Sequence, residues 1–156
     1  MPVRDSVFEF QADLEMAAKK MDMHLNLMVK SIVFELLKKI VMRTPVDTGR
    51  AAGNWSVSQW TPGTEIDEGT GREYAIAKIG KVSFKPAEGV YWIYNNLPYI
   101  EVLEFGLYHD KMGPLREGQA RKTVGGFSIQ APAGMVRVSL AEMDVEVEQM
   151  IRGVAA

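Results

Sequence analysis

TPVDTGRAAGNW, residues 44–55, separates a long run of helix-forming residues from a run with the two-residue alternation of a β-strand. Pro45 prevents the preceding helix from continuing, because its ring does not fit a helix interior. Asp47 and Thr48 can hydrogen-bond to their own backbone amides in a turn, and Gly49 supplies a positive φ where the turn needs one. The stretch is therefore interpreted as a joint that converts helix into strand.

Three further residues of this joint have expected structural roles. Arg50 presents a planar guanidinium that can pair with a carboxylate, for which the C-terminal helix offers candidates. Asn54 can hydrogen-bond to a loop. Trp55 is expected to anchor the first strand in the core.

The segment before the joint, residues 5–43, contains no glycine and no internal proline and predicts one long helix. Apolar residues at spacings of three and four form a first stripe along it: Leu14, Ala18, Met21, Leu25, Met28, Ile32 and Leu36. A second set lies on the opposite face: Met16, Met23, Leu27, Phe34 and Val41. Such a helix is about 58 Å long, whereas a domain of this size is only about 40 Å across. The helix must therefore project from its domain or break.

Two alternatives account for apolar residues on both faces of this helix. In the first, the helix is a central core element, or it breaks into a hairpin near Met21–His24. In the second, the second face meets another subunit. The residue pattern leaves both alternatives open.

The middle of the chain is expected to be rich in β-structure. Alternation and aromatic content predict three strands, paired as an antiparallel meander: residues 54–61, 72–84 and 89–95. Residues 97–105 change to a helical period and predict a short helix capped by Gly106. Glu101 and Glu104 are expected on the solvent face of this helix.

The last third contains a long loop and a second amphipathic helix. Residues 107–126 show no periodicity and carry an excess of basic side chains, so they are expected to contact a partner or to stay mobile until one binds. Residues 132–153 predict the C-terminal helix. Together these elements predict a single domain, residues 1–156, of the α+β class, with a twisted antiparallel sheet of about three to five strands within residues 54–105.

The residue types needed for common catalytic and metal sites are scarce. The chain has no cysteine, which excludes thiolate nucleophiles, disulfides and cysteine-rich zinc sites. His24 and His109, the two histidines, are not at a metal-binding spacing, and no nucleophile elbow or phosphate-binding loop occurs. We therefore expect no enzymatic activity, no metal and no cofactor.

Charge and hydropathy argue against two classes of partner. The chain has 18 basic and 20 acidic residues and a net charge of −2, without the basic excess that is typical of DNA-binding proteins. No apolar run reaches the roughly 20 residues that a membrane span requires. Neither a membrane nor tightly bound nucleic acid is expected as a partner.

Three sequence blocks, in this order, carry a resemblance to a known family: TPVDTGRAAGNW at 44–55, YNNLPYIEVLEFG at 94–106 and QAPAGMVRVSLAEM at 130–143. The chain resembles the neck and tail-completion proteins of long-tailed bacteriophages, the minor tail components that join a filled head to a finished tail. The positions that carry the resemblance are Pro45, Asp47, Thr48, Gly49, Arg50, Asn54, Trp55, Asn96, Pro98, Tyr99, Glu104, Gly106, Gln130, Ala131, Pro132, Gly134 and Arg137.

The resemblance implies a ring-forming structural protein. It implies a homo-oligomer of this chain, most often a hexamer with a dodecamer as the alternative, coaxial with the DNA channel. Its partners would be the head-side connector or stopper proteins and the tail terminator or tail tube, with DNA only passing through the lumen. The protein would lie in the virion neck after assembly in the host cytoplasm. Residues 107–126 depart from the family pattern and look like an insertion.

Other functions remain open at this point. The chain could cap the tail tube as a tail terminator, act as a small enzyme through carboxylates or Arg50, or bind DNA. If it forms rings, the expected subunit contacts are the second face of the long helix, with Met16, Met23, Leu27, Phe34 and Val41, and the long loop, with Lys111, Arg116 and Arg121.

Overall fold

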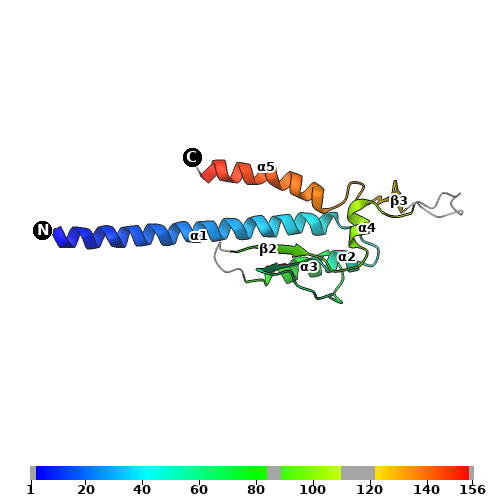
Figure 1. Ribbon diagram of the computed structural model, residues 1–156, viewed down its shortest axis with the longest axis horizontal. Coiled ribbons are helices and arrows are strands. Elements are labelled where there is room, and N and C mark those ends of the chain that lie inside the picture. The colour runs from blue at the N-terminus through cyan, green and yellow to red at the C-terminus, as the bar shows by residue number, and fades with distance from the viewer. Residues whose placement is uncertain (1–2, 84–88, 110–121, 155–156) are drawn as a thin grey trace.

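The computed structural model describes residues 3–83, 89–109 and 122–154, with the side chains of the two long helices described from residue 10 and up to residue 153. Helix α1, Val3–Arg43, forms the spine of an elongated molecule (Figure 1). Its C-terminal part packs between helix α5, Val136–Val154, and a small body made of the central segments. Its N-terminal part extends beyond that body.

Helix α1 is continuous over 41 residues, or about 62 Å, because nothing in its sequence interrupts the backbone hydrogen bonds. The predicted alternative of a hairpin near Met21–His24 is therefore wrong. The helix ends as predicted before Pro45. At that end the Thr44 backbone N–H donates to the Ile40 carbonyl oxygen over 3.0 Å, and the Thr44 hydroxyl donates to the same oxygen over 2.8 Å.

The joint after α1 leads through a one-turn helix, α2 (Arg50–Gly53), into strand β1 (Ser56–Gln59). Strand β1 pairs antiparallel with β2, Tyr91–Tyr94, in the register Ser56↔Tyr94 to Gln59↔Tyr91. The first and third predicted strands are therefore confirmed, with shorter bounds.

The second predicted strand, residues 72–84, is wrong. Residues Arg72–Gly80 form helix α3, and residues 84–88 lie outside the described residues. Ala75 and Ile79, four residues apart, are both buried on one face of this helix. Alanine and the i, i+4 spacing favour a helix, and this outweighs the short stretch of strand-like alternation.

The remaining elements complete an α+β fold. Helix α4, Ile100–Phe105, ends at Gly106 in the left-handed conformation (φ 66°), as predicted. A small hairpin follows, in which strands β3 (Thr123–Val124) and β4 (Phe127–Ser128) have two residues each. The end of the predicted loop is therefore structured. The described residues thus contain two separate two-stranded sheets in place of the one larger sheet that was predicted.

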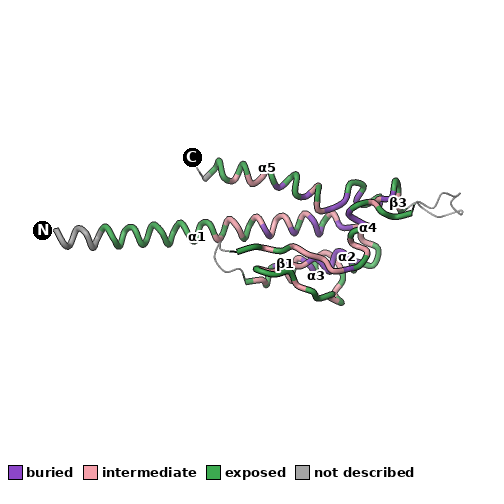
Figure 2. Tube along the Cα trace, in the orientation of Figure 1, coloured by how far each residue is buried: buried purple, intermediate pink, exposed green. Residues whose placement is uncertain are grey.

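The hydrophobic core lies at the C-terminal end of α1. Leu37, Ile40 and Val41 are fully buried there. The side chains that pack around them come from every later part of the chain: Ala51, Trp55, Val57, Ala75, Ile79, Leu97, Leu103, Ala131 and Met135. The core therefore uses only the last third of the helix (Figure 2).

Candidate interaction surface

The projecting part of α1 presents apolar side chains that no described part of the chain covers. Residues 10–25 are all exposed, and Figure 2 shows this stretch as a continuous exposed segment. Among residues 10–27 the large apolar side chains are between 42% and 65% exposed: Phe10, Leu14, Met16, Met21, Met23, Leu25 and Leu27. Soluble monomers rarely leave such contiguous apolar surface in water, and it commonly marks an interaction site.

The predicted second face of α1 divides into two parts. Met16, Met23 and Leu27 are each more than half exposed, so they are available for a partner. Val41 is fully buried in the core of its own chain, and Phe34 packs against that core. The prediction that Val41 lies at a subunit contact is therefore wrong, because α1 enters its own core over its last three turns.

Helix α5 lies beside the C-terminal half of α1 and is held there by ion pairs. Lys39 Nζ lies 3.4 Å from Glu142 Oε2 and 2.8 Å from Glu146 Oε1, and the Arg43 guanidinium also pairs with Glu142. The Arg43 side chain lowers the pKa of Glu142 by donating a hydrogen bond, and Lys39 adds to the effect. These contacts fix the face of α5 that α1 covers, and the opposite face stays exposed.

The expected pairing of Arg50 with a carboxylate on the C-terminal helix does not occur. Among the described residues, the ion pairs from this region to α5 come from Lys39 and Arg43, in the last two turns of α1 before the joint. Arg50 itself is exposed. The prediction named the right helix as partner but the wrong arginine.

The three sequence blocks meet at the end of α1. The backbone of Val46 both donates to and accepts from the Gln130 side chain, over 2.9 and 3.1 Å. Asp47 forms an exposed ion pair with Lys122 over 3.2 Å. Ala131 is buried in the same core. The first and third blocks, more than 80 residues apart, are therefore directly bonded.

The joint itself is built as the sequence indicates. Gly49 has φ 80°, and the Thr48 hydroxyl accepts the backbone N–H of Arg50 over 3.4 Å. The Asn54 side chain accepts the backbone N–H of Asp67 over 2.7 Å, which ties down the following loop. The buried Trp55 indole donates to the Thr44 hydroxyl over 2.7 Å. The side chain of Asp47 bonds to Lys122, and not to its own turn as expected.

The prediction for Glu104 is also wrong. It is buried, not on the solvent face, and its carboxylate accepts the backbone N–H groups of Met135, Val136 and Arg137 at the start of α5 over 2.7–3.1 Å. Burial opposes ionisation, but these backbone donors and the Arg137 guanidinium together hold the pKa of Glu104 below its usual value. Glu101 remains exposed, as predicted.

Glu104 therefore caps α5 and connects the second block to the third. Arg137 completes the connection, because it donates from Nε to the Glu104 carboxylate over 3.1 Å and from its terminal nitrogen to the Glu104 carbonyl over 2.7 Å. Gly134 allows this contact, since a Cβ atom there would lie 2.6 Å from the Glu104 carbonyl oxygen. A local sequence pattern gives no signal of this role, because the helix that Glu104 caps begins 32 residues later.

Other residues of the three sequence blocks also support turns. The Asn96 side chain donates to the carbonyl oxygens of Gly63 and Glu65 over 3.0 and 2.9 Å. A Cβ atom at Gly106 would overlap the Phe127 ring, so this glycine lets the small hairpin pack against α4. Pro98 and Pro132 lie exposed in the turns before α4 and α5.

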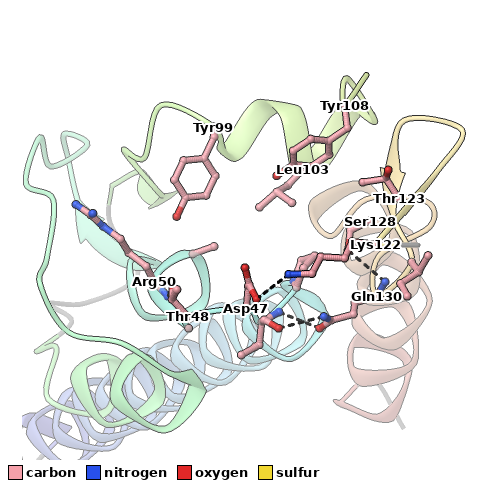
Figure 3. A pocket seen from close by; sticks show the side chains of 15 residues that line it. Asp47, Thr48, Arg50, Tyr99, Leu103, Tyr108, Lys122, Thr123, Ser128 and Gln130 are labelled. Atoms are coloured by element: carbon pink, nitrogen blue, oxygen red, sulfur yellow. Dashed lines mark hydrogen bonds and ion pairs between the residues drawn. The ribbon is translucent and has the colours of Figure 1, made fainter. Parts of the chain in front are cut away.

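A hollow of about 400 Å³ lies where the three blocks meet (Figure 3). Its walls come from the joint, from Tyr99, Leu103 and Tyr108 around α4, and from the small hairpin. Arg50 and Lys122 border it from opposite sides (Figure 3). Asp47 and Arg50 line this hollow, and Glu104 does not.

Several expectations fall outside what the structure describes or stand apart from this surface. Lys111, Arg116 and Arg121 lie outside the described residues. His24 and His109, both described, are exposed on α1 and after α4. In the described segments no helix is long and apolar enough to cross a membrane.

Compared with known protein families, curated proteins and solved structures, the chain shows no match to any of them.

Proposed function

We propose that this protein is a structural subunit that buries its remaining apolar surface against other copies of itself, and that these copies form a ring in the neck of a long-tailed bacteriophage. The observation that carries the proposal is the uncovered surface of α1 over residues 10–27. In the ring, this surface is buried between neighbouring copies. DNA passes through the lumen, and the ring bridges the head connector and the tail.

The energetic argument for assembly follows from burial. Full burial of one large apolar side chain contributes about 1.5–3 kcal/mol, and seven such side chains are exposed along this stretch. Two copies that cover even half of this area gain enough to offset much of the entropy lost on association. Residues 10–27 of this helix add little to the stability of their own chain, because they make no contact with the core.

The placement in a phage neck rests on the resemblance of the three blocks. Residues of the three blocks contact one another in the fold, as Gln130 does with Val46 and Arg137 with Glu104. Such contacts hold the parts of the fold together and involve no bound substrate. The three blocks therefore have a structural role, and this favours a structural protein over an enzyme.

The proposal is tested by mass and by location. Light scattering or native mass spectrometry of the purified chain should give a discrete oligomer, with six copies as the expected number. Imaging of phage particles with the subunit labelled should place it between the connector and the tail. Label at the end of the tail tube would instead identify a tail terminator. A chain that stays monomeric and never associates with heads or tails would refute the proposal.

A further inference from the structure

One face of the projecting helix combines exposed apolar side chains with lysines. Met16, Met23 and Leu27 are spaced by seven and four residues and therefore lie on one side of α1. At 100° per residue, three lysines fall on the same side or beside it. We call this set the lysine-flanked stripe: Met16, Lys19, Lys20, Met23, Leu27 and Lys30. All six residues are exposed, and among the described residues none of the three lysines is in an ion pair.

Helix α5 has an exposed face of the opposite charge. Residues 140–151 contain four acids and no base, and two of the acids, Glu142 and Glu146, are held by Lys39 and Arg43. The other two, Asp144 and Glu148, lie on the side away from α1, together with apolar side chains that are 47–57% exposed. Glu148 also pairs with Arg152, one turn further along the helix, over 3.3 Å. We call this side the acidic outer face: Leu140, Asp144, Val145, Glu148 and Ile151.

We propose that the lysine-flanked stripe of one copy packs against the acidic outer face of α5 in a neighbouring copy. This proposal rests on the proposed self-assembly and names the two surfaces that meet. Residues 16–30 cover about 21 Å of helix and residues 140–151 about 17 Å, so the two surfaces match in length. Methionines adapt their shape to a partner surface, and the opposite charges align the two helices.

Contacts within one chain satisfy these surfaces only in part. Glu148 pairs with Arg152 over 3.3 Å, whereas Asp144 and the three lysines of the stripe are in no ion pair among the described residues. The ion pairs of Lys39 and Arg43 hold α5 against α1 of the same chain, which turns the acidic outer face away from α1. Pairing of two lysine-flanked stripes with each other would bring lysines together and leave Asp144 without an opposite charge. Like charges in contact are unfavourable, whereas the stripe and the acidic face attract.

The proposed contact joins two different surfaces, so it can repeat head-to-tail from one copy to the next. Each copy then offers its α1 stripe to one neighbour and its α5 face to the other. Such contacts generate closed rings when the rotation between copies returns to the start. The contact is therefore consistent with a ring, whereas a two-fold dimer would require both pairs of surfaces to meet between the same two copies.

The absence of cysteine from the chain allows a clean cross-linking test. One single-cysteine protein carries Met23→Cys, and three others carry Leu140→Cys, Val145→Cys or Ile151→Cys. Each α5 variant is mixed with the Met23→Cys protein under mild oxidation. We expect at least one pair to form a mixed disulfide dimer, because a disulfide needs Cα atoms within about 7 Å. The matched control Leu25→Cys, on another face of α1, should give at least about tenfold less mixed product.

A charge-exchange experiment tests the same contact independently. The double variant Lys19→Glu/Lys20→Glu and the double variant Asp144→Lys/Glu148→Lys should each associate with themselves at least about tenfold more weakly than the original chain. A 1:1 mixture of the two should associate more strongly than either alone. The control Asp22→Lys changes charge on α1 outside the stripe and should keep the original association. Circular dichroism confirms that each variant is folded.

Three outcomes would overturn the docking. Met23→Cys proteins that link only to each other would show stripe-to-stripe pairing. Charge variants that assemble like the original chain would place the contact elsewhere, and an original chain that stays monomeric would exclude it altogether. Imaging of labelled phage particles tests the neck proposal separately. If the labelled subunit lies in the neck, that proposal is supported, whichever surfaces join the copies.

Discussion

Replacing Glu104 by glutamine tests how the end of α4 holds the start of α5. The two carboxylate oxygens accept four hydrogen bonds, from the backbone N–H groups of Met135, Val136 and Arg137 and from the Arg137 side chain. Glutamine has a single acceptor oxygen, and its NH₂ group would face two of these donors. The change removes a charge from the start of α5 and leaves two donors without an acceptor.

The expected cost follows from these contacts. Two lost hydrogen bonds cost about 1–1.5 kcal/mol each, and loss of the negative charge at a helix N-terminus costs roughly a further 0.5–1 kcal/mol. The free energy of unfolding should therefore fall by about 3 kcal/mol, a large part of the 5–15 kcal/mol typical of a folded domain. With a urea m-value near 2 kcal/mol/M, the unfolding midpoint should fall by about 1.5 M.

The assay is urea unfolding followed by circular dichroism, at one fixed protein concentration. The matched control is Glu101→Gln, which changes the exposed carboxylate three residues earlier on the same helix and should shift stability by less than about 0.5 kcal/mol. A Glu104→Gln effect as small as that of the control would refute the capping argument.

The pH dependence gives a second check with a defined sign. The pKa of Glu104 is lowered in the folded protein from the ordinary value of 4.5, so its carboxylate stabilises the fold above about pH 4.5. That contribution is lost as the pH falls through the folded-state pKa. The difference in stability between the original chain and Glu104→Gln should therefore shrink below about pH 4.5. A difference that stays constant down to acid pH would contradict the ionised cap.

Two further predictions address the projecting helix and the joint. Removal of residues 1–24 should leave the melting temperature of the dilute protein unchanged within about 2 °C but abolish self-association, because the described side chains of this segment, residues 10–24, are exposed and make no core contact; a large drop in melting temperature would show that the segment supports the fold. Gly49→Ala should cost about 1–3 kcal/mol, because φ is 80° there and the new Cβ would lie 2.8 Å from the Gly71 backbone nitrogen. Gly80→Ala, which meets nothing within 4 Å, is the control, and equal costs for the two changes would refute the strain argument.

The candidate surface could be predicted only in part from the sequence. The two apolar faces of the long helix are visible as residue spacing, so the exposure of Met16 and Met23 follows once the helix is known to project. The position where α1 enters the core is not visible in that spacing. Val41 belongs to the same predicted face as Met23 but is fully buried, because the core packs around that end of the helix.

Helix α1 and its end, the first strand and the C-terminal helix were determined by the sequence alone. Each depends on neighbours along the chain: an uninterrupted helical run, a proline after Thr44, or an alternation around Val57. These signals act over a few residues, so they do not need the rest of the fold. That is why they could be predicted without coordinates.

Only the tertiary structure decided the state of residues 72–80 and the role of Glu104. Nine residues with alanines fit both a strand and a helix, and packing of Ala75 and Ile79 against the core selected the helix. A glutamate on a short amphipathic helix is ordinarily solvated. Glu104 is buried because the fold brings the unbonded N–H groups of α5 to it from 32 residues away, and a buried carboxylate is stable only with such donors.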